Sequence, residues 1–185
     1  MNRKEITEWL RKLLIENKLQ GFGKHYSSEV TFDYGTKKVR RIDFLLFEPL
    51  NQMCIDGIEK GTFTVFEIKS CKADFKSGYG RNFIAEKNYY VMTMETYKSL
   101  LYKEIAELPP EVGVYVAIPT SKDVYDEFVS PTDIESDCKW KLHCIKKSIG
   151  GNRYRSMIEL LFCMLRSGKW VYQNLEREIK HIVKL

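Results

Sequence analysis

The alternation of apolar and polar positions divides the chain into short segments with the periodicity of strands or helices. Residues 40–47 and 62–69 are rich in β-branched and aromatic side chains and are separated by turn-forming residues, so they predict two neighbouring strands. Three charged residues interrupt these apolar runs, namely Asp43, Glu67 and Lys69. Because side chains alternate along a strand, Glu67 and Lys69 point to the same face. Charged side chains are rarely buried unless they are paired or bind a metal, so these three residues outline a chemical site.

Helical periodicity appears at four other places in the chain. Apolar residues spaced by three and four positions predict amphipathic helices over residues 3–20, 94–107, 154–166 and 170–184. Glycines follow the first of these helices and a Pro-Pro pair follows the second, as expected where a helix ends. The apolar positions of the third helix are predicted to be core residues: Met157, Ile158, Leu161, Phe162 and Leu165.

Four more strands and three irregular connections complete the expected order. The strands are predicted at residues 29–32, 88–93, 112–118 and 139–145. Residues 48–61 and 119–137 are expected to be loops, and residues 70–81 a short helix that runs into a mobile loop. This order indicates one α/β or α+β domain over residues 1–185 with a mixed sheet. Its core is expected at about 3–118, followed by a C-terminal strand and helices at about 138–185.

Composition narrows the class of protein. A chain of 185 residues with 44% hydrophobic and 30% charged residues is typical of one globular domain. No apolar run is long enough to span a bilayer, and no membrane association is expected. The five cysteines are odd in number and lack a CxxC pair, which favours reduced thiols and a cytoplasmic location. The net charge of +5, with local concentrations of Lys and Arg, suits a polyanionic partner, although an ordinary solvated surface is an equal explanation.

The residues around the charged positions resemble a known group of enzymes. Arg41-x-Asp43 is followed by Glu67-Ile68-Lys69-Ser70 and then by Asp74-Phe75, and the stretch Leu108-Pro-Pro-Glu-Val-Gly113 precedes a buried strand. This series is similar to the PD-(D/E)xK nuclease superfamily, most closely to its MmcB-type DNA-repair branch. The similarity runs from about residue 29 to residue 118 and implies a restriction-endonuclease-like core. The connection over residues 49–61 is longer than expected for the family, and residues 78–81 replace a tryptophan-bearing segment.

The resemblance also implies a metal centre. Asp43, Glu67 and the backbone carbonyl of Ile68 would bind Mg²⁺ or Mn²⁺, because Mg²⁺ prefers oxygen ligands and commonly takes one or two carboxylates with water and phosphate. Lys69 would orient the attacking water or stabilise the transition state. Glu29 and Glu8 are candidates for an additional carboxylate. The alternative for Asp43, Glu67 and Lys69 is a strand salt bridge with no chemistry.

The expected partner is DNA. Arg41, Lys72, Lys76 and Arg81 are candidate contacts to its backbone, and Tyr79 is a candidate for stacking on a displaced base. Arg153 and Arg155 lie at a predicted helix start, where a phosphate can also use free amide groups. A solvated lysine-rich surface is the alternative for these residues.

Together these features predict a metal-dependent DNA endonuclease or repair nuclease that is structure-selective or nicking. Nothing in the sequence indicates an element that reads base sequence, so a homodimer or a partner protein is expected to supply specificity. Two alternatives remain open at this stage. One is a non-catalytic DNA-binding or adaptor protein that retains the nuclease fold, and the other is a structural domain without affinity for nucleic acid.

Overall fold

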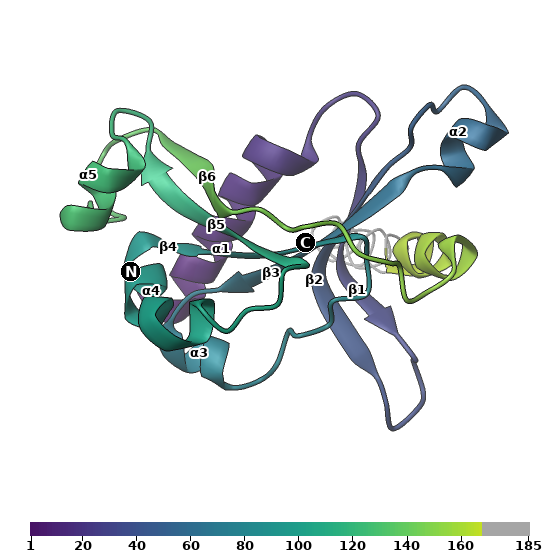
Figure 1. Cartoon of the computed structure of the whole chain (residues 1–185), viewed down its shortest axis with the longest axis horizontal. Helices are drawn as coiled ribbons and strands as arrows, with labels where there is room; N and C mark the ends of the chain where they lie inside the picture. The colour runs from purple at the N-terminus through teal and green to yellow at the C-terminus, as the bar shows by residue number, and fades with distance from the viewer. Residues whose placement is uncertain (168–185) are drawn as a thin grey trace, which may run out of the picture.

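In the computed structural model, which describes residues 1–167, a six-stranded mixed sheet forms the centre of an α/β fold (Figure 1). The strands lie side by side in chain order: β1 (His25–Phe32), β2 (Arg40–Glu48), β3 (Thr62–Lys69), β4 (Lys87–Thr93), β5 (Val112–Pro119) and β6 (Trp140–Lys146). The pairs β3–β4 and β4–β5 are parallel, and the other three are antiparallel. The predicted α/β class and mixed sheet are therefore confirmed.

Short helices flank this sheet. They are α1 (Arg3–Leu14), which continues as the π-helix η1 (Ile15–Leu19), α2 (Ile55–Glu59), α3 (Lys72–Lys76), α4 (Met94–Leu100), which continues as the π-helix η2 (Leu101–Ile105), and α5 (Val124–Val129). Residues 157–167 are also helical. Within residues 1–167, no helix has the length and apolar character needed to cross a lipid bilayer.

Helix α1 covers one face of the sheet. Asn2 and Glu5 form a reciprocal capping box at its start, which satisfies backbone donors that would otherwise lack partners. Its apolar stripe, including Leu10 and Leu14, packs against Phe66 and the other inward side chains of β2, β3 and β4. The polar side of α1 does not pack against this cluster and borders the candidate site described below.

The opposite face of the sheet is covered in two parts. The helix over residues 157–167 packs on the β1–β2 hairpin and on Val65, whereas α3 and α4 pack on β4 and β5 around Tyr90. Phe44 on β2 belongs to the cluster beneath α1, but Ile42, two residues earlier, belongs to the cluster on the other face. The hairpin therefore twists at Asp43, which lies between the two clusters.

Several sequence predictions of local structure need correction. The expected loops 48–61 and 119–137 contain α2 and α5, and the strand expected at 29–32 begins four residues earlier, at His25. The helix expected at 94–107 changes to π-helical geometry after Leu100. The helix predicted for 170–184 lies outside the described residues. All five cysteines are free thiols.

The predicted core stripe of the helix at 157–167 is wrong at three of its five positions, whereas Met157 and Leu161 are partly buried and pack against the core. Ile158, Phe162 and Leu165 are exposed, and the buried positions are instead Leu160, Cys163 and Met164. Two hydrogen bonds explain this orientation. The Ser27 hydroxyl donates to the Met164 carbonyl, and the Arg166 guanidinium donates to the Thr31 carbonyl. These bonds fix the face of the helix that lies on β1.

Gly113 on β5 provides a test of the packing between β5, its neighbour β4 and the backbone at Ser148. A Cβ at this position would lie 2.4 Å from the ring of Tyr89 and 2.6 Å from the Ser148 nitrogen. We expect Gly113→Ala to lower the free energy of unfolding by about 1–3 kcal/mol, measured by urea denaturation. Gly151→Ala is the control, because its nearest neighbour would be 3.6 Å away. Equal losses in both variants would contradict the close packing at Gly113.

Candidate functional site

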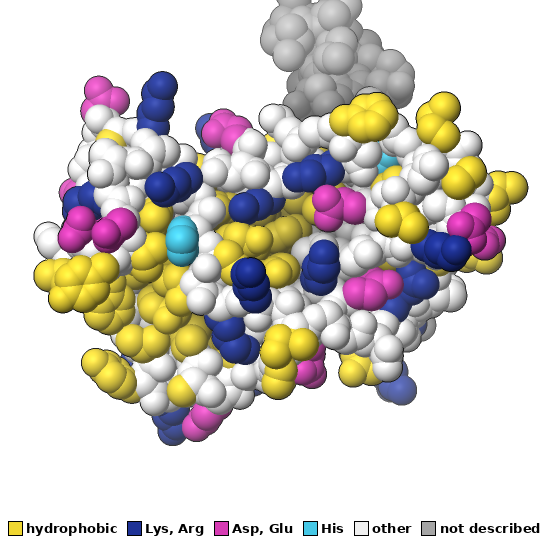
Figure 2. Space-filling view, turned by 45° about the horizontal axis from the view of Figure 1, so that its top comes forward, with side chains coloured by type: hydrophobic (Ala, Val, Ile, Leu, Met, Phe, Trp, Pro, Cys, Tyr) yellow, Lys and Arg dark blue, Asp and Glu magenta, His cyan; other side chains and the backbone are white. Residues whose placement is uncertain are grey.

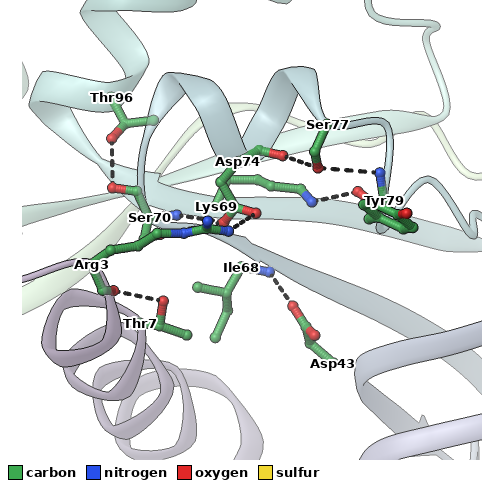
Figure 3. A network of polar contacts seen from close by, with 10 residues as sticks. All are labelled: Arg3, Thr7, Asp43, Ile68, Lys69, Ser70, Asp74, Ser77, Tyr79 and Thr96. Atoms are coloured by element: carbon green, nitrogen blue, oxygen red, sulfur yellow. Dashed lines mark hydrogen bonds and ion pairs between the residues drawn. The ribbon is translucent and has the colours of Figure 1, made fainter.

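A gap between β2 and β3 positions the candidate site. The pairing of these strands runs from Glu48↔Thr62 to Phe44↔Phe66 and ends there. Beyond it, the Ile68 N–H donates to Asp43 Oδ2 at 2.8 Å, so a side chain replaces the missing strand partner (Figure 3). The N–H and C=O of one strand residue point to the same side, which directs the Ile68 carbonyl into the same gap.

Glu67 and Lys69 are buried beside this gap. Their side chains are only 2% and 3% exposed. Burial, and then the charge of Asp43, raises the pKa of Glu67 to about 9, and Lys69 offsets only part of this increase. Burial likewise raises the pKa of Asp43, although its hydrogen bond from Ile68 opposes the change. The Glu67 carboxyl therefore retains its proton at neutral pH when no cation is bound.

A short segment covers these buried groups. Lys69 Nζ donates to the carbonyl of Tyr79 at 2.6 Å (Figure 3). Gly80 has a left-handed φ of +70°, and a Cβ on it would lie 2.6 Å from Glu67 Oε2 and 2.8 Å from Lys69 Nζ. The Asn82 side chain donates to the Arg41 carbonyl and ties the segment to β2. We call residues 78–82 the covering segment.

Glu29 lies opposite Asp43 on the neighbouring strand. The β1–β2 register passes from Ser28↔Phe44 to Val30↔Ile42, and Glu29 falls between these pairs with a φ of +54°. This left-handed conformation is uncommon and costly for a residue other than glycine, and such strain often occurs at functional sites. The Glu29 carboxylate forms ion pairs with Arg11 at 2.8 Å and Arg41 at 2.9 Å. Its negative charge raises the pKa of both Asp43 and Glu67.

These groups line a cavity of about 820 Å³ between α1, the β1–β2 hairpin and the covering segment. Basic side chains in its lining are Arg3, Arg11, Arg40, Arg41, Lys69 and Arg81. Acidic side chains are Glu8, Glu29, Asp43, Glu67 and Asp74. The cavity therefore contains both kinds of charge. Carboxylates lie at its floor, and most of the arginines lie on its walls.

Asp74 joins three elements at one wall of the cavity. Its Oδ1 accepts an ion pair from Arg3 of α1 at 2.7 Å, and its Oδ2 accepts hydrogen bonds from the backbone and hydroxyl of Ser70 (Figure 3). The side chain therefore connects α1, α3 and the end of β3. This connection holds the start of α1 next to Lys69.

The structure brings together most of the site residues predicted from the sequence. All of the predicted catalytic and metal-binding residues line the cavity: Asp43, Glu67, Ile68, Lys69, Glu29 and Glu8. Two of the predicted DNA contacts, Arg41 and Arg81, line it as well. The other four predicted DNA contacts do not line it. Lys72 donates to the Ser99 carbonyl, Lys76 pairs with Glu104, Arg153 with Glu86, and Arg155 with Asp33.

Several cavity residues were not predicted as site residues. Arg3, Thr7 and Arg11 come from α1, and Tyr34 and Arg40 come from the β1–β2 hairpin. The α1 residues carry a recognisable signal, because positions 3, 7 and 11 have the i, i+4, i+8 spacing of one helix face. The hairpin residues have no such pattern, since their position depends on the twist of the two strands.

The residues at the gap fit a divalent cation, as judged from their chemistry. Glu67 Oε1 is buried without a hydrogen-bond partner. Bound positive charge would also relieve the repulsion that raises the pKa of Glu67. Within residues 1–167, no group of three or more His, Cys, Asp or Glu side chains is arranged to hold a metal ion. Two carboxylates and a carbonyl are nevertheless sufficient protein ligands for Mg²⁺, which keeps several waters.

No protein-family model and no curated protein matches this chain. A solved structure is similar in fold. It is the SPO1766 protein of unknown function from Silicibacter pomeroyi, with a TM-score of 0.52 and 16% sequence identity. The similarity covers 90% of this chain and 86% of that chain. At this level of identity, it shows a common fold and carries no information on activity.

The raised pKa of Glu67 makes stability depend on pH. Its carboxyl has a pKa of 4.5 ordinarily and about 9 in the folded, metal-free protein. Between these values the folded state binds more protons than the unfolded state, so stability falls as the pH rises. We expect Glu67→Gln to flatten this dependence in EDTA and to raise the melting temperature above that of wild type toward pH 9, measured by thermal unfolding.

Exposed Glu59 on α2 provides the control for this measurement, because Glu59→Gln removes a carboxylate that lies in solvent. It is expected to keep the wild-type pH dependence. Mg²⁺ or Mn²⁺ is expected to stabilise wild type at the upper end of the range and to have a smaller effect on Glu67→Gln. An unchanged pH dependence in Glu67→Gln would show that Glu67 does not retain its proton.

Proposed function

We propose that this protein is a Mg²⁺- or Mn²⁺-dependent DNA endonuclease with a restriction-endonuclease-like core, related to the PD-(D/E)xK superfamily and acting in DNA repair. The observation that carries the proposal is the pairing of half-buried Asp43 with buried Glu67, held beside buried Lys69 where β2 separates from β3. Removing two carboxylates and an ammonium from most of their contact with water is energetically costly. A bound cation would best compensate the carboxylates, and a phosphate would best compensate the ammonium. The sequence similarity described above points to the same residues.

Asp43, Glu67 and the Ile68 carbonyl would hold the cation, which when bound supplies charge neutralisation at the phosphate and activation of a water. Asp43 already has one oxygen fixed by the Ile68 N–H, so its remaining oxygen is held in a defined direction. Glu67 must lose its proton for this role, and the positive charges of the cation and of Lys69 favour that loss.

Lys69 would act on the phosphate or on the attacking water. In the structure its ammonium is bonded to the Tyr79 carbonyl, so substrate would replace that carbonyl as the acceptor. An ammonium here can stabilise developing negative charge and can also transfer a proton. Arg would be a poor substitute if a proton moves, because a guanidinium remains protonated.

The basic surface supports a polyanionic partner. Arg3, Arg40 and Arg81 line the cavity above the carboxylates. Separately from this cavity, Figure 2 shows a face of the molecule on which Lys and Arg side chains lie around a patch of hydrophobic atoms. The net charge of +5 agrees with this distribution. A second copy or another protein would supply specificity in this proposal.

One observation favours a second candidate function, a non-catalytic DNA-binding or adaptor protein. The covering segment lies directly over the proposed catalytic groups, since a Cβ on Gly80 would meet Glu67 and Lys69, and the Tyr79 carbonyl accepts a hydrogen bond from the Lys69 ammonium. A protein that only binds DNA could keep this arrangement permanently. A nuclease must displace it during each reaction.

The two functions are separated by a cleavage assay on single-stranded, duplex, nicked, branched and flapped DNA with Mg²⁺, Mn²⁺ or EDTA. We expect metal-dependent cleavage by wild type and a loss of at least about 100-fold in rate for Lys69→Ala and Asp43→Asn, because each removes charge stabilisation from the reacting phosphate. Exposed Lys60, which pairs with Asp56 on α2, provides the control Lys60→Ala. Binding without cleavage under every condition would favour the adaptor, and cleavage that persists in EDTA or in Asp43→Asn would contradict the proposed site.

A further inference from the structure

The candidate site is recessed behind three walls. The buried side chains of Glu67 and Lys69 form its floor. Arg3 and Thr7 of α1 line one wall, the tip of the β1–β2 hairpin forms the second, and the covering segment is the third. The covering segment is fastened at both sides of the floor, by the Lys69–Tyr79 bond and by the bond from Asn82 to the Arg41 carbonyl.

Two walls carry exposed aromatic rings. Tyr79 of the covering segment is 82% exposed, and Tyr34 of the hairpin is 68% exposed. Both residues line the cavity, and Arg81 and Arg40 also belong to its lining. The Arg166 guanidinium lies 5.6 Å from the centre of the Tyr34 ring, which holds one face of this ring against the protein. The two tyrosines therefore provide flat apolar surfaces beside basic side chains.

An exposed tyrosine beside an arginine is the combination that binds unpaired bases. Every base has a flat face that can stack on an aromatic ring, while arginine neutralises the adjoining phosphate. In a duplex these faces are occupied by neighbouring base pairs. Glu67 and Lys69 are also almost fully buried, and the phosphates of a stiff duplex are less free than those of a single strand to enter such a recess. A single strand is narrow and flexible enough to place a phosphate on the floor.

We infer that the cavity binds single-stranded DNA, either as a free strand or as the unpaired part of a branched molecule, with bases stacked on Tyr79 and Tyr34. This inference rests on the proposed nuclease function, to which it adds the substrate class. Arg40 and Arg81 bind phosphates on either side of the site. The strand displaces the Tyr79 carbonyl from Lys69, so the covering segment moves from an internal contact to a contact with substrate.

Fluorescence anisotropy with labelled single-stranded and duplex oligonucleotides of the same sequence tests the inference independently of cleavage. Titrations in Ca²⁺ and in EDTA, at one salt concentration, give a Kd for each DNA. We expect wild type to bind the single strand at least about tenfold more tightly than the duplex. Tyr79→Ala and Tyr34→Ala are each expected to weaken single-strand binding about tenfold, the effect of losing one stacked base.

Two further variants separate stacking from general damage. Tyr79→Phe retains the ring and is expected to bind as wild type does. Tyr102 is 92% exposed on η2 and does not line the cavity, so Tyr102→Ala is expected to leave both Kd values unchanged. Equal or tighter binding of duplex, or equal effects of Tyr79→Ala and Tyr102→Ala, would overturn the inference.

A pair of glycine variants tests the covering segment itself. Gly80→Ala would insert a methyl group against Glu67 and Lys69, whereas Gly78→Ala, at a similar φ of +78°, would meet no atom within 4 Å. Both variants carry a comparable backbone cost, so the difference between them reports the contact with the floor. Gly80→Ala is expected to lower the preference for single strand over duplex by more than Gly78→Ala does. Equal preferences in the two variants would show that the segment does not control access.

The outcomes for the inference and for the proposed function can be told apart. Cleavage of duplex that depends on Asp43 and Lys69, without preference for a single strand, would retain the nuclease and overturn the inference. Tyrosine-dependent binding of the single strand without cleavage by any metal would support the inference as a statement on binding and reject the nuclease.

Discussion

The hydrogen bond from the Ile68 N–H to Asp43 Oδ2 is the contact on which the candidate site depends. It occurs where β2 leaves β3, and it replaces a backbone partner that the strand ladder no longer provides. A buried backbone donor without a partner is costly, so the carboxylate stabilises the separation of the strands. The same bond fixes Asp43 beside Glu67. A structural requirement of the sheet thus also orients the carboxylate on which the proposed function depends.

The cost of this arrangement falls on Glu67. Its carboxyl is buried, lies near Asp43 and Glu29, and has one oxygen without a hydrogen-bond partner. The protein accommodates it in the metal-free state by keeping it protonated and by covering it with Gly80. A structural domain would gain stability from an apolar residue at this position, because replacing buried charge by packed apolar groups is often neutral or stabilising. Keeping a carboxyl here is therefore best explained by a ligand, and the proposed cation is the ligand that suits two carboxylates and a carbonyl.

The surroundings of the site combine fixed and movable parts. Arg11, Glu29 and Asp74 are held in ion pairs that connect α1 to the β1–β2 hairpin and to the end of β3. Two hydrogen bonds attach the covering segment to β2 and β3. The segment also contains two glycines in the left-handed conformation, Gly78 and Gly80. This difference would suit a site in which the floor stays rigid while substrate displaces the covering segment. It also explains how the structure can show Lys69 engaged by the backbone and still be compatible with the proposed chemistry.

The sequence by itself located the strands along the chain and the charged residues at the floor of the candidate site. Enrichment in β-branched and aromatic residues located β3, and a continuous apolar run located β5, because both patterns are typical of buried strands. Asp43, Glu67 and Lys69 were recognisable because charges within apolar strands are rare. The tertiary structure alone decided the rest. The i, i+4 spacing of Arg3, Thr7 and Arg11 was visible, but only the packing of α1 shows that this face borders the carboxylates. Likewise, the left-handed Glu29, the contact of Gly80 with Glu67, and the buried stripe of the last described helix depend on residues far apart in the chain. Local patterns report which side chains prefer burial, whereas the partner that buries them is set by how the whole sheet twists and packs.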